Sequence, residues 1–219
     1  MNNRQSGFTL VEIAIVLVII GLLLGGVLKG QELVNSAKVK NFVNDFRGIS
    51  AFVYAYQDRF RATPGDDAAA AGHVQGGVAA TTPAGATLNN SRINGNWNSV
   101  TVTDESYLFW QHIRLAGLAT GTPIIGNADY VPRNADGGRI GITGDPVLTA
   151  PATPFPGTFF VCSDGIQGRF VRQIDTTIDD GNSQTGSVRA LANNVVNQAD
   201  AANVQPVDDA TLYTVCMAY

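Results

Sequence analysis

The chain has 219 residues, a formal net charge of −4 and an apolar fraction of 45%. This composition is too apolar and too weakly charged for a disordered chain, and the lack of a long basic run argues against nucleic acid as the primary partner. Glycine is frequent, with 24 residues, which favours a loop-rich domain with β-strands over a helical bundle. The chain is long enough for an N-terminal stalk and one domain with its own core.

An apolar run dominates the N-terminal end. Residues 7–28 have the sequence GFTLVEIAIVLVIIGLLLGGVL, in which Glu12 is the one charged residue. A run of about 20 residues can cross the hydrocarbon core of a bilayer as a helix. The polar leader, residues 1–7, carries Arg4, which would stay on the cytoplasmic side and direct the rest of the chain outward.

An ordinary secretory signal peptide is the alternative interpretation of this run. It would need an n-region, an apolar core and small residues for a peptidase, here Gly25 and Gly26. Three features count against it: the apolar run is long for a signal peptide, no A-x-A site follows, and an acidic residue lies near its start.

The helical pattern continues beyond the apolar run. Apolar residues recur at alternating steps of three and four, which places them on one stripe of a helix: Val39, Phe42, Phe46, Ile49, Val53, Tyr56 and Phe60. We therefore expect one helix over residues 8–60, about 80 Å long. Pro64 should stop it, because proline disfavours helical geometry in the preceding residue.

Loops and short helices are expected next. Residues 66–101 are rich in Ala, Gly, Asn and Thr, and we expect a loop with a short helix near residues 66–71, anchored to the core by Trp97. A second helix is expected over residues 104–118, with Thr103 as its cap and Gly121 and Pro123 after it.

The C-terminal part is expected to form a sheet. Residues 122–157 carry many Gly and Pro and should be loop with short strands. Three strands are predicted over residues 158–162, 168–174 and 211–217, with a helical turn near residues 186–191. They would form an antiparallel sheet that supports the long helix.

Cys162 and Cys216 are the two cysteines of the chain. If they lie outside the cytoplasm, a disulfide bond between them is expected. The loop that it closes corresponds to about 4 kcal/mol in the chain-entropy model. Two buried thiols are the alternative.

Residues Gly7-Phe8-Thr9-Leu10-Val11-Glu12 resemble the processing site of type IV prepilins and type II secretion pseudopilins. The resemblance is most specific over about residues 4–35. It implies that a prepilin peptidase cuts after Gly7 and methylates Phe8, the new N-terminus. It also implies that Glu12, the fifth residue of the mature chain, pairs with the Phe8 amine of a neighbouring subunit during assembly. A carboxylate that reaches the lipid headgroups is the alternative for Glu12.

The resemblance implies an α+β, pilin-like fold, in which the long helix packs against a C-terminal antiparallel sheet. The parts would be a leader, a transmembrane and polymerisation half of the helix, an outer amphipathic half and a globular head: residues 1–7, 8–28, 29–62 and 63–219. The implied function is that of a structural filament subunit and not of an enzyme. No Ser-His-Asp order, HExxH, CxxC or phosphate loop is present, and His112 is expected to be a packed or surface residue.

The implied location is the bacterial inner membrane, with the head in the periplasm, and later a periplasmic or surface filament. The implied partners are other pilin subunits, a prepilin peptidase, an assembly ATPase, inner-membrane platform proteins and membrane lipid. A type II secretion pseudopilin and a membrane-anchored extracytoplasmic binding protein that never assembles are the alternatives.

The repeats Gly21-x-x-x-Gly25 and Gly26-x-x-x-Gly30 would allow close helix packing in lipid, and Lys29 stands where family members often have a proline. No cofactor is expected. The acidic segment of residues 175–182 is interpreted as a solvated turn with side-chain to main-chain hydrogen bonds. A calcium site with Asp175, Asp179 and Asp180 as candidate ligands is the alternative, because some pseudopilins of the family bind calcium in a C-terminal loop.

Overall fold

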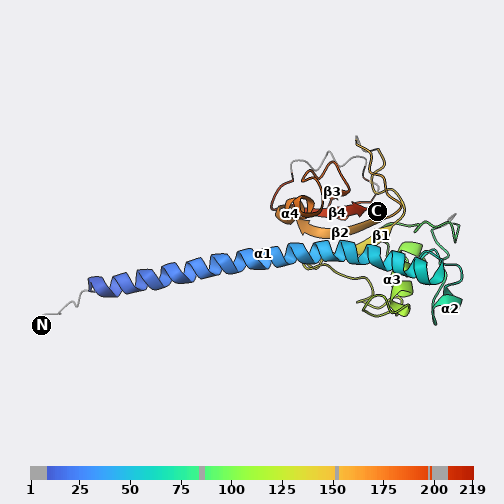
Figure 1. Ribbon diagram of the computed structural model, residues 1–219, viewed down its shortest axis with the longest axis horizontal. Coiled ribbons are helices and arrows are strands. Elements are labelled where there is room, and N and C mark those ends of the chain that lie inside the picture. The colour runs from blue at the N-terminus through green and yellow to red at the C-terminus, as the bar shows by residue number, and fades with distance from the viewer. Residues whose placement is uncertain (1–8, 84–86, 151–152, 197, 199–206) are drawn as a thin grey trace, which may run out of the picture. The chain divides into compact units, whose positions relative to one another are not determined.

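A computed structural model of the chain describes residues 9–83, 87–150, 153–196, 198 and 207–219. Helix α1, Leu10–Phe60, comes first (Figure 1). The chain divides into two compact units, with the boundary after Lys38, so α1 contributes to both. The remaining helices are α2 (Ala70–His73), α3 (Glu105–Leu115) and α4 (Gly168–Ile178), and the strands are β1 (Ile140–Thr143), β2 (Phe160–Gln167), β3 (Val188–Ala192) and β4 (Leu212–Ala218).

The second unit begins with the C-terminal half of α1, which carries the predicted apolar stripe. Phe42, Phe46 and Val53 are at most 1% exposed, and the stripe ends at the half-buried Phe60. These side chains belong to one core that also contains residues of α3, α4 and the sheet. The rings of Phe42 and Phe170 lie 6.2 Å apart, so α1 packs directly on α4. The prediction of a helix packed against an antiparallel head is confirmed.

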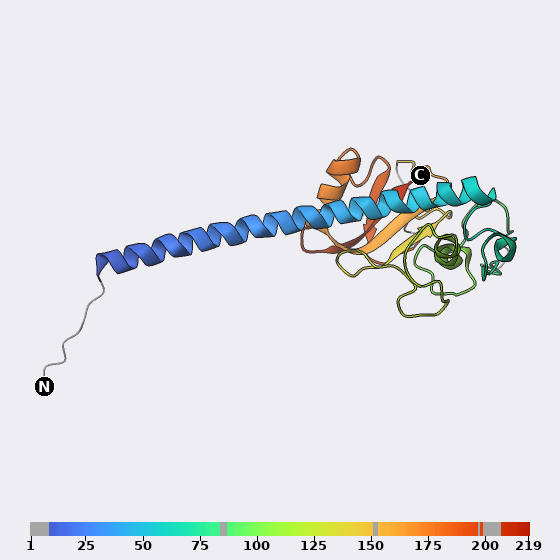
Figure 2. The same ribbon diagram turned by 60° about the horizontal axis from the view of Figure 1, so that its bottom comes forward.

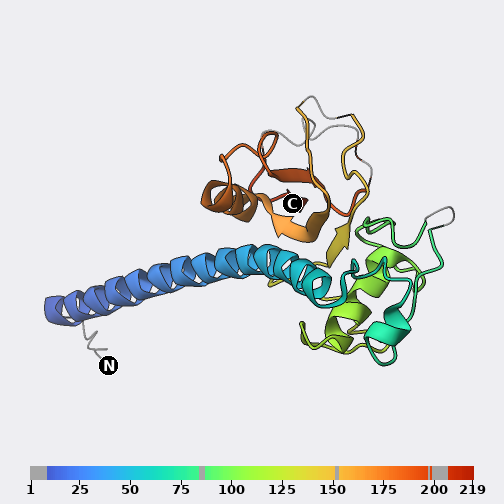
Figure 3. The same cartoon turned by 45° about the vertical axis from the view of Figure 1, so that its right-hand side comes forward.

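The four strands form one antiparallel sheet in the order β1-β2-β4-β3. Figure 3 shows the sheet with α4 beside it, and α2 and α3 at the C-terminal end of α1. The central strands β2 and β4 are paired so that Cys162 lies opposite Cys216. A disulfide bond joins these two cysteines, as predicted. Both are completely buried.

The predicted strand over residues 168–174 is wrong, because this segment is the start of helix α4. Phe170, Val171 and Ile174 are buried on one face of the helix, and Arg169 and Arg172 are exposed. A strand would place Phe170, Arg172 and Ile174 on the same side, so the arginine contradicts the alternating pattern. In a helix, by contrast, the buried apolar residues lie on one face and the two arginines lie on the other.

The predicted helical turn near residues 186–191 is also wrong. Val188–Ala192 form strand β3, which pairs with β4 from Val188 opposite Met217 to Ala192 opposite Tyr213. The hydrogen bonds and burial that this pairing provides outweigh the weak local preference for a helix, since strand formation depends strongly on its neighbours.

Helix α3 is shorter than predicted. Asp104, not Thr103, is its N-cap residue, and it makes no side-chain cap hydrogen bond. The helix ends at Leu115 with Gly117 in a left-handed conformation, φ +73°. The Gly117 N–H donates to the Arg114 carbonyl and the Leu118 N–H to the Ile113 carbonyl, both at 2.9 Å. This is a Schellman motif, so Gly117 stops the helix before Gly121 and Pro123 are reached.

The long loop between α1 and α3 is anchored as expected. Trp97 is 3% exposed, and its indole N–H donates to the Val195 carbonyl at 3.1 Å. The short helix in this loop, α2, begins at Ala70, four residues later than the expected start at Asp66. Figure 2 shows α2 just past the C-terminal end of α1 and α3 below the last turns of α1.

Candidate functional site

The predicted processing residues Gly7 and Phe8 lie outside the described residues. The described residues begin with Thr9, and α1 begins at Leu10. The candidate site within them is the start of α1 and the apolar segment that follows it.

Thr9 and Glu12 close the N-terminus of α1 with reciprocal hydrogen bonds. The N–H and the hydroxyl group of Thr9 each donate to Glu12 Oε2 at 2.8 Å, and the Glu12 N–H donates to Thr9 Oγ1 at 3.3 Å. This pattern is a capping box, which satisfies backbone donors that a helix start leaves unpaired. The sequence signal is present, a threonine followed three residues later by a glutamate before an apolar run, and it could have identified Thr9. Glu12 thus has a local structural role besides the predicted pairing with Phe8.

The apolar side chains of α1 before Lys38 are exposed within the chain. Leu10 is 90% exposed and Leu22 is 73% exposed, and the same holds at lower values for the other large apolar residues up to Val34. By length and composition this helix could cross a membrane. Lys29 and Glu32 form an exposed ion pair at 2.6 Å just beyond the apolar run. Such a charged pair is suited to a position at the edge of a hydrocarbon layer.

The glycines of the small-residue repeats face open space. A Cβ atom added at Gly21, Gly25, Gly26 or Gly30 would meet no atom within 4 Å. No close contact within the described part of the chain therefore requires these glycines. Each lowers helix stability by about 1 kcal/mol relative to alanine. In this chain α1 is nonetheless one continuous helix through all four positions.

The predicted calcium ligands lie together at the end of α4. One carboxylate oxygen of each of Asp175, Asp179 and Asp180 lies within 4.8 Å of the others. Asp175 and Ser183, in the following loop, are both buried, and among the described residues Asp175 Oδ2 and Ser183 Oγ have no hydrogen-bond partner. An unpaired buried polar atom is costly, so each of these atoms would be stabilised by a further partner.

Hydrogen bonds of the solvated-turn type are also present in this loop. The Asn182 N–H donates to Asp180 Oδ1 at 2.8 Å, and the Gly181 N–H donates to Asp175 Oδ1 at 3.1 Å. The buried guanidinium of Arg189 donates to the carbonyls of Gln184 and Gly186. Its charge lowers the pKa of Asp175, but burial dominates and raises this pKa to about 6. The three carboxylates and one arginine leave a net negative charge.

Both histidines are held by hydrogen bonds in the head. His112 is completely buried. Its Nδ1 accepts the Gly65 N–H at 2.9 Å, so Nε2 carries the proton and donates to the Val78 carbonyl at 2.9 Å. Burial lowers the pKa of His112, which keeps it neutral. This histidine is a packed structural residue, as expected.

His73 belongs to a second polar cluster. Its Nδ1 lies 2.7 Å from Asp67 Oδ2, which also accepts the hydroxyl group of Tyr56 at 2.7 Å. Asp67 Oδ1 accepts the Ala69 N–H at 2.9 Å. Asp67 is completely buried, so these bonds fasten the loop after α1 to the helix itself.

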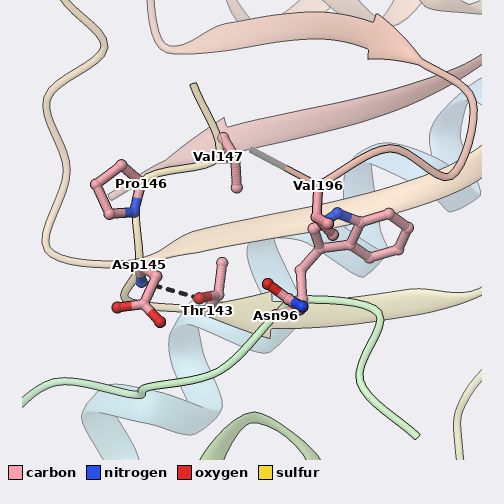
Figure 4. Close-up of a pocket in the computed structure, with 7 residues that line it drawn as sticks. Asn96, Thr143, Asp145, Pro146, Val147 and Val196 are labelled. Atoms are coloured by element: carbon pink, nitrogen blue, oxygen red, sulfur yellow. Dashed lines mark hydrogen bonds between the residues drawn. The ribbon is translucent and has the colours of Figure 1, made fainter. Parts of the chain in front are cut away.

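A small cavity lies under the Trp97 loop (Figure 4). Its volume is about 10 Å³, and Asn96, Thr143, Asp145, Pro146, Val147 and Val196 line it together with Trp97. The Asp145 N–H donates to Thr143 Oγ1 at 2.8 Å across one side of it. Such a volume holds about one water molecule and is too small for an organic substrate.

Comparison with known proteins adds one match. Residues 2–28 match the family model of the prokaryotic N-terminal methylation motif, so the chain carries a prepilin-type signal of type IV pilins and pseudopilins. Proteins with this motif are structural rather than enzymatic, and the motif with one long apolar helix fits a membrane-anchored protein. No curated protein matches the chain. No solved structure matches it either.

Proposed function

We propose that the chain is a structural subunit of a type IV pilus-like filament. The observation that carries this proposal is the methylation motif at residues 2–28, which leads directly into a helix with exposed apolar side chains. In water, each fully exposed Leu, Ile or Val forgoes about 1.5–3 kcal/mol of burial free energy. The segment up to Val34 therefore needs lipid or other helices around it.

Two environments satisfy this requirement in turn. As an inner-membrane protein, the chain would store its apolar segment in lipid. In the filament, the same segment would pack against the helices of neighbouring subunits. A bundle interior excludes water, so the Glu12 carboxylate would need a cationic partner there. Cleavage after Gly7 creates one, the amine of Phe8.

The chemistry of assembly belongs to partner proteins. A prepilin peptidase would cleave after Gly7 and methylate Phe8, and an assembly ATPase with its membrane platform would extract the subunit from lipid. Other pilin subunits, of the same or a different kind, would complete the polymer.

Electron microscopy of cells that produce the chain, with antibody labelling of its head, tests the proposal. We expect labelled filaments in the fraction sheared from the cell surface. Labelled filaments confined to the periplasm would instead support a type II secretion pseudopilin. A chain that stays in the membrane as single subunits would contradict assembly and support a membrane-anchored binding protein.

The cluster of Asp175, Asp179 and Asp180 at the end of α4 favours the pseudopilin alternative, since some pseudopilins bind calcium in a C-terminal loop. We propose that Asp175, Asp179 and Asp180 hold a calcium ion, supported by the unpartnered buried Asp175 Oδ2. Bound calcium would neutralise the clustered carboxylates and fix the loop between α4 and β3.

Calorimetric titration of the full chain in detergent with calcium chloride tests this site. We expect heat of binding and a higher melting temperature, and both should be lost in Asp175→Asn. Asp58→Asn, on the exposed side of α1, is the matched control and should bind as the original chain does. The absence of heat and of a thermal shift in the original chain would remove the site.

A further inference from the structure

A cleft in the head is lined by residues of α1, α3 and β1. Its volume is about 260 Å³, far more than the roughly 10–15 Å³ that one water molecule requires. Apolar side chains form much of its wall, among them Ile49 and Phe52 of α1, Trp110 of α3 and Ile140 of β1. Asp45 of α1 also lines it, and we refer to it as the Asp45 cleft. It has room for an extended side chain with an apolar stem.

The carboxylate of Asp45 is half-buried in this cleft and has no partner in the described part of the chain. Neither a hydrogen-bond donor nor a cation contacts it there. Burial raises the pKa of Asp45 to about 6, and no neighbouring charge contributes to this change. A partly buried carboxylate without a donor or a counter-ion is less stable than the same group in water. A cation that entered the cleft would therefore stabilise it.

Arg114 is the cationic residue of the cleft, and its guanidinium group is bound elsewhere. Its Nε–H donates to the Thr120 carbonyl at 3.2 Å, and Nη1 donates to the carbonyls of Thr122 and Tyr130 at 2.9 and 2.6 Å. These three bonds hold the guanidinium against the loop after α3. The cation that Asp45 lacks therefore has to come from another part of this chain or from another chain.

Lys40 and Arg61 are exposed basic residues of the head that could supply it. Neither side chain has a hydrogen bond, ion pair or ring contact among the described residues. The charge of Arg47, by contrast, already acts on Tyr219. Lys40 and Asp45 are five residues apart in α1, which turns their side chains about 140° away from each other around the helix axis. One chain cannot pair these two residues, whereas two copies can.

The register of the proposed filament favours Lys40 over Arg61. In that filament, Glu12 of one subunit pairs with the Phe8 amine of its neighbour, which offsets two parallel α1 helices by four residues. The same offset along α1 places Asp45 level with Asn41 of the neighbouring helix, beside Lys40. Arg61 of that neighbour would lie about 30 Å further along the helix direction. The flexible four-carbon stem of lysine can bridge the short distance that remains.

We propose that, in the filament, Lys40 of each subunit enters the Asp45 cleft of a neighbouring copy and forms an ion pair with the carboxylate there. This inference rests on the proposed function as a filament subunit. The lysine stem lies along Ile49 and Phe52 and buries apolar surface, while the ammonium group reaches the carboxylate. Each subunit donates one lysine and receives another on a different face of α1. Such a heterologous contact repeats without closing and produces an open helical polymer.

Reversal of the two charges tests this contact in cells that produce the chain. Asp45→Lys and Lys40→Asp should each reduce the filaments sheared from the cells about tenfold or more, because like charges then meet in the cleft. The chain with both substitutions should recover filaments. Asp58→Lys and Arg61→Asp, which reverse exposed charges outside the cleft, are the matched controls and should assemble as the original chain does. Mass spectrometry should show normal cleavage in all five variants.

Zero-length cross-linking tests the contact in filaments of the original chain. A carbodiimide joins a lysine amine to a carboxylate that touches it. We expect a ladder of covalent multimers, and a cross-linked peptide in their digest that contains Lys40 and Asp45. Lys40→Arg keeps the positive charge but has no primary amine there, so this variant should assemble and lose the Lys40–Asp45 peptide.

Two results would overturn the contact and leave the filament function intact. In one, the original chain, Asp45→Lys and Lys40→Asp all assemble equally well. In the other, the original filaments yield no peptide that joins Lys40 to Asp45, and this result decides if the charge-reversed variants do not fold. The absence of filaments from the original chain would contradict the proposed function itself, and the inference with it.

Discussion

Glu12 is a residue whose two roles must be separated. In the chain itself, its carboxylate caps α1 together with Thr9. In the proposed filament, its negative charge pairs with the amine of Phe8 in a neighbouring subunit. Substitution by alanine removes both the cap and the charge, so an assembly defect in Glu12→Ala would not identify the cause.

Glu12→Gln and Thr9→Val separate the two roles. Glutamine can serve in a capping box but carries no charge, so we expect Glu12→Gln to be cleaved normally and to form no filaments. Thr9→Val keeps the charge and removes the hydroxyl group, at a cost of about 1 kcal/mol at the helix start, and should still assemble. Cleavage is measured by mass spectrometry and assembly by electron microscopy of sheared fractions.

Normal filaments from Glu12→Gln would refute the charge pair. If Glu12→Gln assembled and Thr9→Val did not, the helix cap and not the charge would be the feature that assembly requires.

The structural role of some residues can be recognised from the sequence, and that of others cannot. The capping box is local, since Thr9 and Glu12 are three positions apart, and its signal could be recognised. Gly65 meets the Glu105 carbonyl group only because the chain after α1 turns back onto α3. No short pattern marks such a contact, so the sequence alone could not predict it.

At the scale of elements, the disulfide joins the two central strands of the sheet. Cys162 and Cys216 face each other in β2 and β4 and are completely buried. The bond restricts the unfolded chain over a sequence separation of 54 residues. Replacing both cysteines by alanine should therefore lower the free energy of unfolding by about 2–4 kcal/mol.

Urea unfolding of the full chain in detergent measures this loss. The original chain treated with a reductant is the control and should be destabilised to a similar extent. Equal stability of the oxidised chain and the double variant would contradict a stabilising role of the bond.

Elements with a long, regular pattern could be predicted, and elements that depend on distant partners could not. The apolar stripe of α1 runs from Val39 to Phe60, which is about six turns of helix. So long a regular pattern predicts a helix, and this prediction is confirmed. Strands β2 and β4 are apolar and contain the cysteines, and both were predicted with shifted ends. Strand β3 depends on its pairing with β4, which is far away in the sequence. Helix α4 has 11 residues, and over so short a segment the pattern of apolar residues does not distinguish a helix from a strand.

For the whole molecule, stability should decline as the pH rises from weakly acidic to weakly basic. Burial raises the pKa of Asp45 and Asp175 to about 6 and that of Glu105 to about 7. Each group favours the folded state while it is protonated there, so its contribution is lost as the pH rises through the folded pKa. The pKa of Asp67 is lowered, so its contribution is lost only as the pH falls through that value.

The melting temperature of the full chain in detergent with a calcium chelator, measured at constant ionic strength, should therefore be highest near pH 5 and fall by pH 8. A melting temperature that rises steadily from pH 5 to 8 would contradict the raised pKa values of these three carboxyl groups.

The apolar segment is proposed to be a polymerisation element that becomes competent on cleavage, and the mature N-terminus tests this role most directly. Mass spectrometry of the chain purified from its native membrane should show a first residue of Phe8 that carries a methyl group on its amine. The motif at residues 2–28 makes this the expected result. An intact Met1 would indicate a plain membrane anchor, and a start near Val27 would indicate a secreted protein, and either would contradict the account.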